Sequence, residues 1–179
     1  MIKFITSSKN KLAEVKAVFP NVEQLDIDLP EIQEIDPHKI IQAKMEEAFN
    51  HLDGEFIVED TSLYFDVLGG LPGPLIKWFM KSMGHDGLYN LCEKLGNNVA
   101  VAKTIIGYAK HRGEISFFEG VLRGRIVKPR VDSKFGWDSI FLPDGHEKTI
   151  AEMSFEEKNK ISMRSLAIEH LKAFYKHQV

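Results

Sequence analysis

The sequence predicts an α/β fold whose β-sheet is at least partly parallel. Through the first 59 residues, apolar β-type segments alternate with amphipathic helical segments, and this order produces parallel strands joined by helices. Hydrophobic side chains make up 44% of the 179 residues, which is enough for a packed core and excludes a disordered chain. No linker, repeat or low-complexity segment divides the chain, so we expect residues 1–179 to form one domain with two merged lobes.

The first half is expected to contain three strands separated by two helices. The strands are predicted at residues 2–6, 22–27 and 55–59, and the helices at residues 10–19 and 36–52. Pro20 ends the first helix because its ring cannot continue the helical hydrogen bonds. Asp36 and Pro37 supply an N-cap and a first-turn proline for the second helix.

The second half is expected to hold helices on either side of two long strands. Helical patterns cover residues 74–82, 86–95 and 163–177, and strand patterns cover residues 99–109 and 115–127. A tight turn at residues 111–113 would join the two strands. Ser154, with Glu157 three residues later, fits a capping box at one more helix start.

The composition excludes several classes of protein. The 23 basic and 26 acidic residues are mixed along the chain and give a net charge of −3, whereas a nucleic-acid-binding protein needs a basic face. The single cysteine, Cys92, cannot form an internal disulfide and fits a reducing compartment. The chain has no run of about 18 apolar residues, and its N-terminal apolar run is too short for a signal peptide. We therefore expect a cytoplasmic protein with no nucleic-acid and no membrane partner.

Two adjacent carboxylates, Glu59 and Asp60, follow an apolar strand pattern and suggest a metal site. Open α/β sheets bind ligands at the carboxyl ends of their strands. Mg²⁺ is typically held by one or two carboxylates together with phosphate oxygens and water. Glu31 is the candidate second ligand. The alternative is that Asp60 caps the turn after the strand and that Glu31 is an ordinary surface side chain.

Cations lie where helices are expected to begin, and one bound polyanion would explain all of them. The cations at these helix starts are Lys9, Lys11, Lys77 and Arg164. A positive charge there is disfavoured by about 0.3–1 kcal/mol unless an anion lies nearby. Arg164 also shares the apolar face of its helix, so its guanidinium needs a partner, and a ligand would serve. Lys44, at the edge of another apolar stripe, is either one more such cation or a side chain whose stem lies at the rim of the core.

Residues 6–11 and 135–138 are candidates for binding the two ends of a nucleotide. In the first segment, three hydroxyl groups and the free N–H groups of a helix start would hold phosphate oxygens. An ordinary serine N-cap with two solvated lysines explains the same pattern. In the second segment, an aromatic ring can stack on a base for about 1–3 kcal/mol. The alternative there is a turn whose aromatic side chains pack in the core.

These segments together resemble the inosine triphosphate pyrophosphatase family, whose members hydrolyse non-canonical purine nucleoside triphosphates. The resemblance covers essentially the whole chain, and its strongest blocks are VEDTSLYFDVLGGLPGPLIKWF (58–79), GRIVKPR (124–130), FGWDSIF (135–141), PDGHEKTIAEM (143–153) and EKNKISMR (157–164). It implies an elongated mixed β-sheet flanked by helices, with two lobes, a central active-site cleft and a homodimeric assembly. It also implies Mg²⁺-dependent cleavage of ITP, dITP or XTP between the α and β phosphates, which releases the monophosphate and pyrophosphate.

The same resemblance implies roles for individual residues. Glu31 and Asp60 would hold Mg²⁺. Asp60 and Lys11 would be catalytic, and two roles stay open for Asp60, as a metal ligand and as the group that activates the attacking water. The residues expected to bind the phosphates are Thr6, Ser7, Ser8, Lys9, Asn10, Lys11, Lys44 and Lys77, and Thr61 is also expected to bind the substrate. Those expected at the base are Phe135, Gly136, Trp137, Asp138, Lys158, Met163 and Arg164.

Two positions depart from the family's pattern. Ser8 stands where the first motif, T-x-N-x-x-K, has asparagine, and we expect a weaker phosphate contact there. Met163 stands where the family has histidine in S-H-R, and a methionine cannot make the side-chain hydrogen bonds of a histidine. These departures keep open the alternative of a nucleotide-binding protein that has lost catalysis. A further alternative is a pyrophosphatase for other modified nucleotides.

Overall fold

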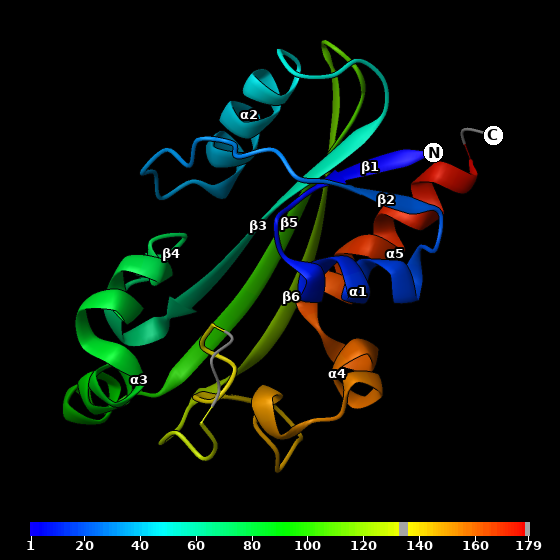
Figure 1. The fold of residues 1–179 in the computed structure, drawn as a ribbon. Coiled ribbons are helices and arrows are strands. Elements are labelled where there is room, and N and C mark those ends of the chain that lie inside the picture. Colours follow the sequence, from blue (N-terminus) through cyan, green and yellow to red (C-terminus); the bar gives the residue numbers. More distant parts are fainter. Residues whose placement is uncertain (133–135, 178–179) are drawn as a thin grey trace. The chain divides into compact units, whose positions relative to one another are not determined.

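The computed structural model describes residues 1–132 and 136–177, which form a mixed α/β fold (Figure 1). The strands are β1 (Ile2–Ile5), β2 (Val22–Leu25), β3 (Phe56–Phe65), β4 (Pro72–Gly73), β5 (Val99–His111), β6 (Glu114–Ile126) and β7 (Phe141–Pro143). The helices are α1 (Lys9–Val18), α2 (Pro37–Ala48), α3 (Ile76–Leu95), α4 (Phe155–Ile161) and α5 (Met163–Lys176), with short 3₁₀ helices η1 (Asp66–Leu68) and η2 (Ile150–Glu152).

All seven strands of the described part belong to one mixed sheet. Its order is β2-β1-β3-β5-β6-β7, and β4 pairs with β3 off this path. β1 runs parallel to both β2 and β3, whereas the pairs β3–β4 and β6–β7 are antiparallel. The predicted α/β class with a partly parallel sheet is therefore confirmed.

The chain divides into two compact units. Unit 1 comprises Met1–Thr61, Thr104–Gly120 and Ser162–Val179, and unit 2 comprises Ser62–Lys103 and Val121–Ile161. The long strands β3, β5 and β6 each contribute residues to both units.

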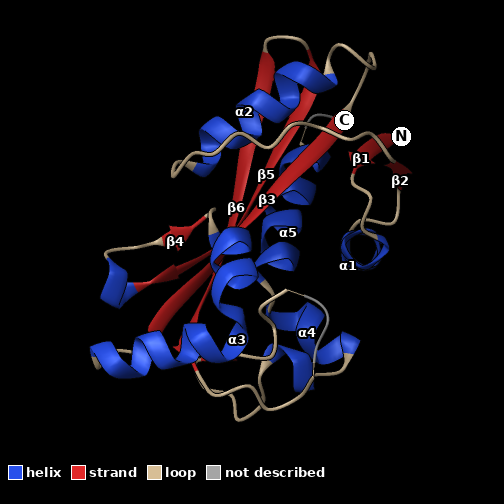
Figure 2. Cartoon of the chain, turned by 60° about the vertical axis from the view of Figure 1, so that its left-hand side comes forward, coloured by secondary structure: helices blue, strands red, loops and turns tan. Residues whose placement is uncertain are grey.

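In unit 1, helices cover both faces of the sheet (Figure 2). Phe4 and Ile57 belong to an apolar cluster that includes residues of α1 and α5. Their neighbours Ile5 and Val58 belong to a second cluster, which includes residues of α2. Successive side chains of a strand point to opposite faces, so α1 and α5 lie over one face and α2 over the other.

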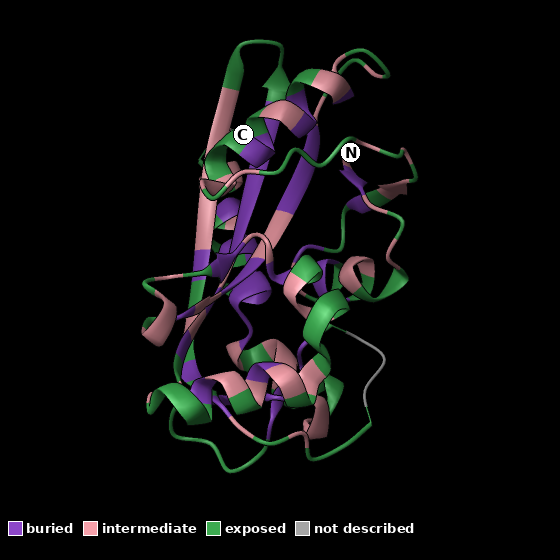
Figure 3. Ribbon diagram, turned by 90° about the vertical axis from the view of Figure 1, so that its left-hand side faces the viewer, coloured by how far each residue is buried: buried purple, intermediate pink, exposed green. Residues whose placement is uncertain are grey.

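In unit 2, α3 and the segment that leads into β7 supply much of the interior. Leu88 and Cys92 of α3 are fully buried, as are Ile140 and Phe141. Buried residues concentrate in the strands, whereas the outer sides of the helices are exposed (Figure 3). Within the described ranges, no helix is both long and apolar enough to cross a membrane.

The most important difference from the predicted elements concerns β3. The strand continues to Phe65, so Glu59 and Asp60 lie in its middle, and the prediction that they end a strand is wrong. The physical reason is that apolar alternation resumes after the two acids, because Leu63 and Phe65 are both fully buried. A strand continues through polar residues when the residues on both sides of them are buried in the core.

Other differences are smaller. The strands β4 and β7 were not predicted, since two or three residues are too few to display a period of two. The helical patterns at residues 74–82 and 86–95 correspond to the two helical stretches of α3, which are separated at Gly84, where the backbone is not helical. The predicted capping box of Ser154 and Glu157 is confirmed, and Thr149 with Glu152 forms another one that was missed.

Candidate active site

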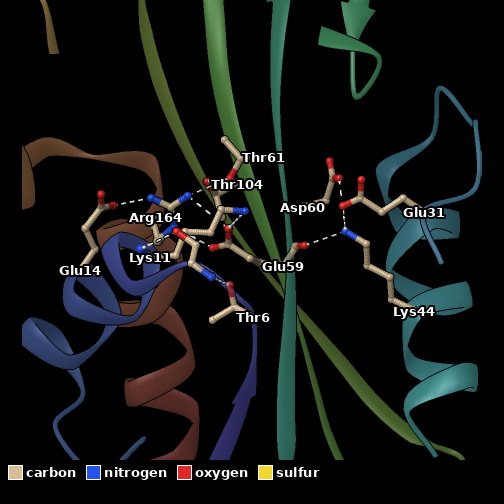
Figure 4. Close-up of polar contacts among 11 residues, drawn as sticks. Thr6, Lys11, Glu14, Glu31, Lys44, Glu59, Asp60, Thr61, Thr104 and Arg164 are labelled. Carbon is tan, nitrogen blue, oxygen red and sulfur yellow. Dashed lines mark hydrogen bonds and ion pairs between the residues drawn. The ribbon is translucent and has the colours of Figure 1, made fainter. Parts of the chain in front are cut away.

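Two neighbouring acids of β3 direct their carboxylates to opposite faces of the sheet in unit 1 (Figure 4). Glu59 faces α1 and α5, where Lys11 Nζ lies 2.7 Å from its Oε1. Asp60 faces α2, where Lys44 Nζ lies 3.9 Å from its Oδ1. The alternation of a β-strand therefore separates the two acids into different chemical environments.

The Glu59 environment is a buried cluster of balanced charge. Arg164 donates two hydrogen bonds to Glu59, from Nε to Oε2 at 2.7 Å and from Nη2 to Oε1 at 3.1 Å. It also donates from Nη1 to Glu14 and from Nη2 to the Thr61 hydroxyl at 3.3 Å. With Lys11, the cluster holds two acids and two bases, so no formal charge is left over.

These contacts shift the proton affinities of both buried groups. Burial opposes ionisation of Glu59, but the charges of Arg164 and Lys11 outweigh it and hold its pKa well below the usual value of 4.5. Burial likewise opposes the charged form of Arg164, and the carboxylates of Glu59 and Glu14 outweigh it and raise its pKa. Both groups are therefore ionised at neutral pH.

This cluster corrects two interpretations made from the sequence. Arg164 has protein carboxylates as partners, so its burial does not require a ligand. Lys11 is not without an anion, because Glu59 compensates it at the start of α1, although its side chain remains 31% exposed. Glu14, which the sequence interpretation missed, is 3% exposed. The sequence did contain a signal for it. Glu14 is a charged residue on the apolar side of α1, next to Val15, and a charge there predicts a buried partner.

The start of α5 is held close to the sheet, which places Arg164 in the cluster. Ser162 caps the helix by accepting a hydrogen bond from Ser165 N at 3.1 Å. A Cβ built on Gly120 of β6 would lie 1.9 Å from the carbonyl oxygen of Met163. Glycine at this position is thus what allows the first turn of α5 to approach the strand.

On the other face, Lys44 of α2 joins two carboxylates. Its ammonium donates to Glu31 Oε1 at 2.9 Å and to the Glu59 carbonyl at 3.1 Å. The side chains of Asp60 and Glu31 point toward this one ammonium (Figure 4). Lys44 is only 7% exposed, so its side chain is buried and does not end at a solvated rim.

The segment 6–11 begins α1 with Ser8 as its N-cap. The Ser8 hydroxyl accepts from Lys11 N at 3.3 Å, and Ser8 N donates to the Thr6 hydroxyl at 3.1 Å. The N-cap alternative is therefore correct for Ser8. Ser7, Lys9 and Asn10 are exposed, so their groups face solvent at the positive end of the helix.

In unit 2, the turn that begins at Gly136 is packed against the protein. Trp137 is 5% exposed and its ring lies edge-on to Phe141, with 5.4 Å between the centroids. Asp138 Oδ2 accepts from Lys158 Nζ at 2.9 Å. The structure thus agrees with the alternative in which Trp137 packs in the core. Phe135, the other aromatic residue expected at the base, lies outside the described residues.

Comparison with known proteins identifies the chain's relatives. The sequence matches the Ham1 family over residues 2–174. The chain belongs to the Ham1 family. It is 42% identical to an inosine triphosphate pyrophosphatase of Schizosaccharomyces pombe, over 97% of this chain and 94% of that protein. It is 44% identical to an inosine triphosphate pyrophosphatase of Pyricularia oryzae, over 97% of this chain and 93% of the other.

A solved structure of the family shares the fold. The Ham1 protein of Staphylococcus aureus matches with a TM-score of 0.82 and 26% identity, over 99% of both chains. The mixed α/β architecture of this Ham1 chain is therefore that of its family.

Eight of the expected site residues of this Ham1 chain form three groups. Glu31, Lys44 and Asp60 meet on one face of the sheet, and Lys11, Thr61 and Arg164 meet around Glu59 on the other. Asp138 and Lys158 pair in unit 2. Outside these groups, Lys77 is exposed in the first turn of α3, and Met163 is buried at the start of α5. The other expected residues lie in the segment 6–10 and at positions 136 and 137, apart from Phe135, which is outside the described residues.

Proposed function

We propose that this Ham1 protein hydrolyses ITP, dITP and XTP to the nucleoside monophosphate and pyrophosphate. The observation that supports this function most directly is the convergence of Glu31 and Asp60 on the Lys44 ammonium. Carboxylates and a cation side by side fit a metal-bound polyphosphate, since the carboxylates bind the metal and the cation binds phosphate. The relatives named above as inosine triphosphate pyrophosphatases give the substrate class.

The metal we propose is Mg²⁺, held by Glu31 and Asp60. Among the described residues, no group of three or more His, Cys, Asp or Glu side chains is arranged to hold a metal. Two carboxylates suit Mg²⁺ because it keeps several waters and takes further ligands from substrate phosphates. When bound, the ion would neutralise charge on the phosphate oxygens during attack and departure.

The chain's own groups would then bind and orient the triphosphate. We propose that residues 6–11 bind phosphate oxygens through exposed side chains and through N–H groups at the start of α1. Lys11 is 31% exposed while it contacts Glu59, so it retains solvent access for a phosphate contact. Lys44 and Lys77 would balance the triphosphate charge. Asp60, besides holding the ion, would accept a proton from the water that attacks the α phosphorus.

Selection of the base is proposed for residues of the 135–138 segment, with Lys158, Met163 and Arg164. The Arg164 guanidinium is hydrogen-bonded to Glu14, Glu59 and Thr61. Its proposed effect on base binding would therefore be indirect, through the positions of those three residues. Hydrogen-bond donors directed at a 6-oxo group are left unpaired when a 6-amino purine enters, and this rejects ATP. Because Met163 replaces the family histidine, the discrimination rests on the remaining donors.

The proposal is tested by incubating the purified protein with ITP, dITP, XTP, GTP and ATP, with Mg²⁺ and with EDTA. We expect pyrophosphate and monophosphate from ITP, dITP and XTP and none from ATP, and no products with EDTA. GTP carries the same 6-oxo group as ITP, so its rate tests whether the site also discriminates at the 2-amino group. Release of orthophosphate without pyrophosphate would contradict the reaction. Tight binding of ITP without turnover would instead support a nucleotide-binding protein that has lost catalysis.

We further propose that the protein acts in the cytoplasm as a homodimer that binds no nucleic acid. Light scattering coupled to gel filtration measures the assembly: a molar mass of about twice the 20.4 kDa of one chain supports a dimer, and a mass equal to one chain contradicts it.

A further inference from the structure

A histidine of α3 holds the turn that begins at Gly136. In unit 2, His85 Nε2 lies 2.8 Å from the carbonyl oxygen of Gly136, and His85 Nδ1 lies 3.2 Å from the hydroxyl oxygen of Ser139. One imidazole therefore contacts both ends of the four-residue turn 136–139. The contact lies within unit 2, whereas the acids and cations around Glu59 and Asp60 belong to unit 1.

The hydrogen-bond chemistry of this contact fixes the tautomer of His85. A carbonyl oxygen can only accept, so Nε2 must carry the hydrogen that is donated to Gly136. In the neutral ring Nδ1 is then the acceptor, and the Ser139 hydroxyl donates to it. The ring is thereby held at both nitrogens, which determines its orientation.

The backbone of α3 explains why a histidine at position 85 can make this contact. Gly84 has φ 66° and ψ −178°, which interrupts the helix immediately before His85. Only glycine adopts this conformation without strain, because it has no Cβ. His85 therefore sits at the start of a new helical stretch, and its position differs from the one a continuous helix would give.

Other contacts fix the middle of the turn. Asp138 pairs with Lys158 at 2.9 Å, and the Asp138 carbonyl accepts from Ala151 N at 3.1 Å. Trp137 is packed edge-on against Phe141. Gly136 itself is exposed and has φ 55°, so its backbone has the freedom of a glycine unless a neighbour restrains it.

A nucleophilic role for Ser139 does not fit this arrangement. The residue is fully buried, so a substrate cannot reach its hydroxyl, and the contact with His85 is structural in character.

We propose that His85 is a positioning residue for nucleobase binding. It orders the turn 136–139 by tethering Gly136 and Ser139 to α3. The inference rests on the proposed function, in which this segment binds the base. Loss of the tether would weaken substrate affinity because the turn must be ordered on binding. The chemical step would be unchanged, since the hydrogen bonds of His85 within the described residues are with Gly136 and Ser139, and neither is assigned to phosphate or metal.

Two near-isosteric variants separate the two contacts of the imidazole. The side-chain amide of Gln can replace Nε2–H toward Gly136, while the shorter amide of Asn reaches only the position of Nδ1. We expect KM for ITP to rise about five- to tenfold in His85→Ala and His85→Asn, the size of one lost hydrogen bond. We expect kcat to be unchanged in both, and His85→Gln to restore most of the affinity.

A matched control is available in unit 1. His170 Nδ1 also contacts a backbone carbonyl, that of Glu119, at 2.8 Å. His170→Ala should therefore leave KM and kcat at their wild-type values. A loss of kcat at constant KM in His85→Ala would overturn the positioning role. Equal defects in the Gln and Ala variants would overturn it too, because a donor at Nε2 would then be irrelevant.

A second readout does not depend on activity. The chain has two tryptophans, so in a Trp78→Phe background the emission reports on Trp137, within the turn. Acrylamide quenching of Trp137 should increase in His85→Ala and return toward the starting value in His85→Gln. Unchanged quenching in His85→Ala would overturn the tether whatever the activity. Absence of turnover in the wild-type protein would instead refute the proposed function, and the role in base affinity with it.

Discussion

Arg164 of α5 and Glu59 of β3 lie 105 residues apart in the sequence and form a bidentate ion pair in the interior of unit 1. Glu14 and Lys11 complete a cluster of two acids and two bases. Such a cluster is weak support for stability when it replaces apolar packing, but removing one member leaves buried charge without compensation. The cluster therefore fixes the first turns of α1 and α5 relative to β3.

We expect Glu59→Gln to destabilise the protein by about 3–5 kcal/mol at pH 7, because Lys11 and Arg164 would then share the single carboxylate of Glu14. Urea unfolding followed by circular dichroism measures the free energy of unfolding. Glu23→Gln, an exposed position in β2, is the matched control and should change stability by less than about 0.5 kcal/mol. A Glu59→Gln protein as stable as the control would show that the cluster is energetically neutral.

The same pair predicts how stability depends on pH. The pKa of Glu59 is lowered on folding from its usual value of 4.5, so its contribution is complete above that pH. As the pH falls below 4.5, Glu59 of the unfolded chain is protonated before Glu59 of the folded protein. The contribution of Glu59 to the free energy of unfolding therefore decreases until the pH reaches the pKa of the folded state. The difference in stability between the wild type and Glu59→Gln should therefore narrow between pH 5 and pH 3. A constant difference across this range would exclude Glu59 as the titrating group.

How much of this arrangement the sequence could predict depends on the distance between partners. The alternation of apolar residues predicted β1, β3, β5 and β6, and the capping residues Ser8 and Asp36 predicted helix starts, because both signals are local. The partners of Arg164 were not predictable, since Glu14 lies 150 residues away. Of the cations at helix starts, Lys11 and Arg164 were assigned to a ligand, whereas the fold supplies Glu59 and Glu14 as their partners.

Asp60→Asn should reduce kcat for ITP by at least about 100-fold, the scale of a lost general base or metal carboxylate. The fold should persist, because asparagine has the same shape and Lys44 keeps its bonds to Glu31 and the Glu59 carbonyl. Pyrophosphate release and the thermal midpoint are the measurements. Asp53→Asn, an exposed position in unit 1, should have wild-type values of both. A wild-type rate in Asp60→Asn would exclude Asp60 from both of its proposed roles.

Gly84→Ala tests the backbone that presents His85. Alanine at φ 66°, ψ −178° is strained by about 1–3 kcal/mol, and the strain is relieved if α3 becomes continuous and carries His85 away from the turn. We expect lower stability together with a higher KM for ITP. Ser82→Ala, an exposed position of the same helix, should change neither. A normal KM in a destabilised Gly84→Ala protein would show that the break in α3 is unrelated to substrate binding.

Gly120→Ala tests the close approach of β6 to α5. The added Cβ would lie 1.9 Å from the Met163 carbonyl and 2.7 Å from Ala167 N, and both are backbone atoms of a helix that cannot yield by rotating a side chain. Overpacking of this kind costs about 1–3 kcal/mol or more, and the displaced first turn of α5 would carry Arg164 away from Glu59. We therefore expect a lower free energy of unfolding at pH 7 and a smaller further decrease of it on acidification, as in Glu59→Gln.

Val121→Ala, the exposed neighbour on the same strand, should have little effect on either measurement. A Gly120→Ala protein with wild-type stability would mean that α5 can move off the strand at no cost, and the geometry that places Arg164 would then need another explanation.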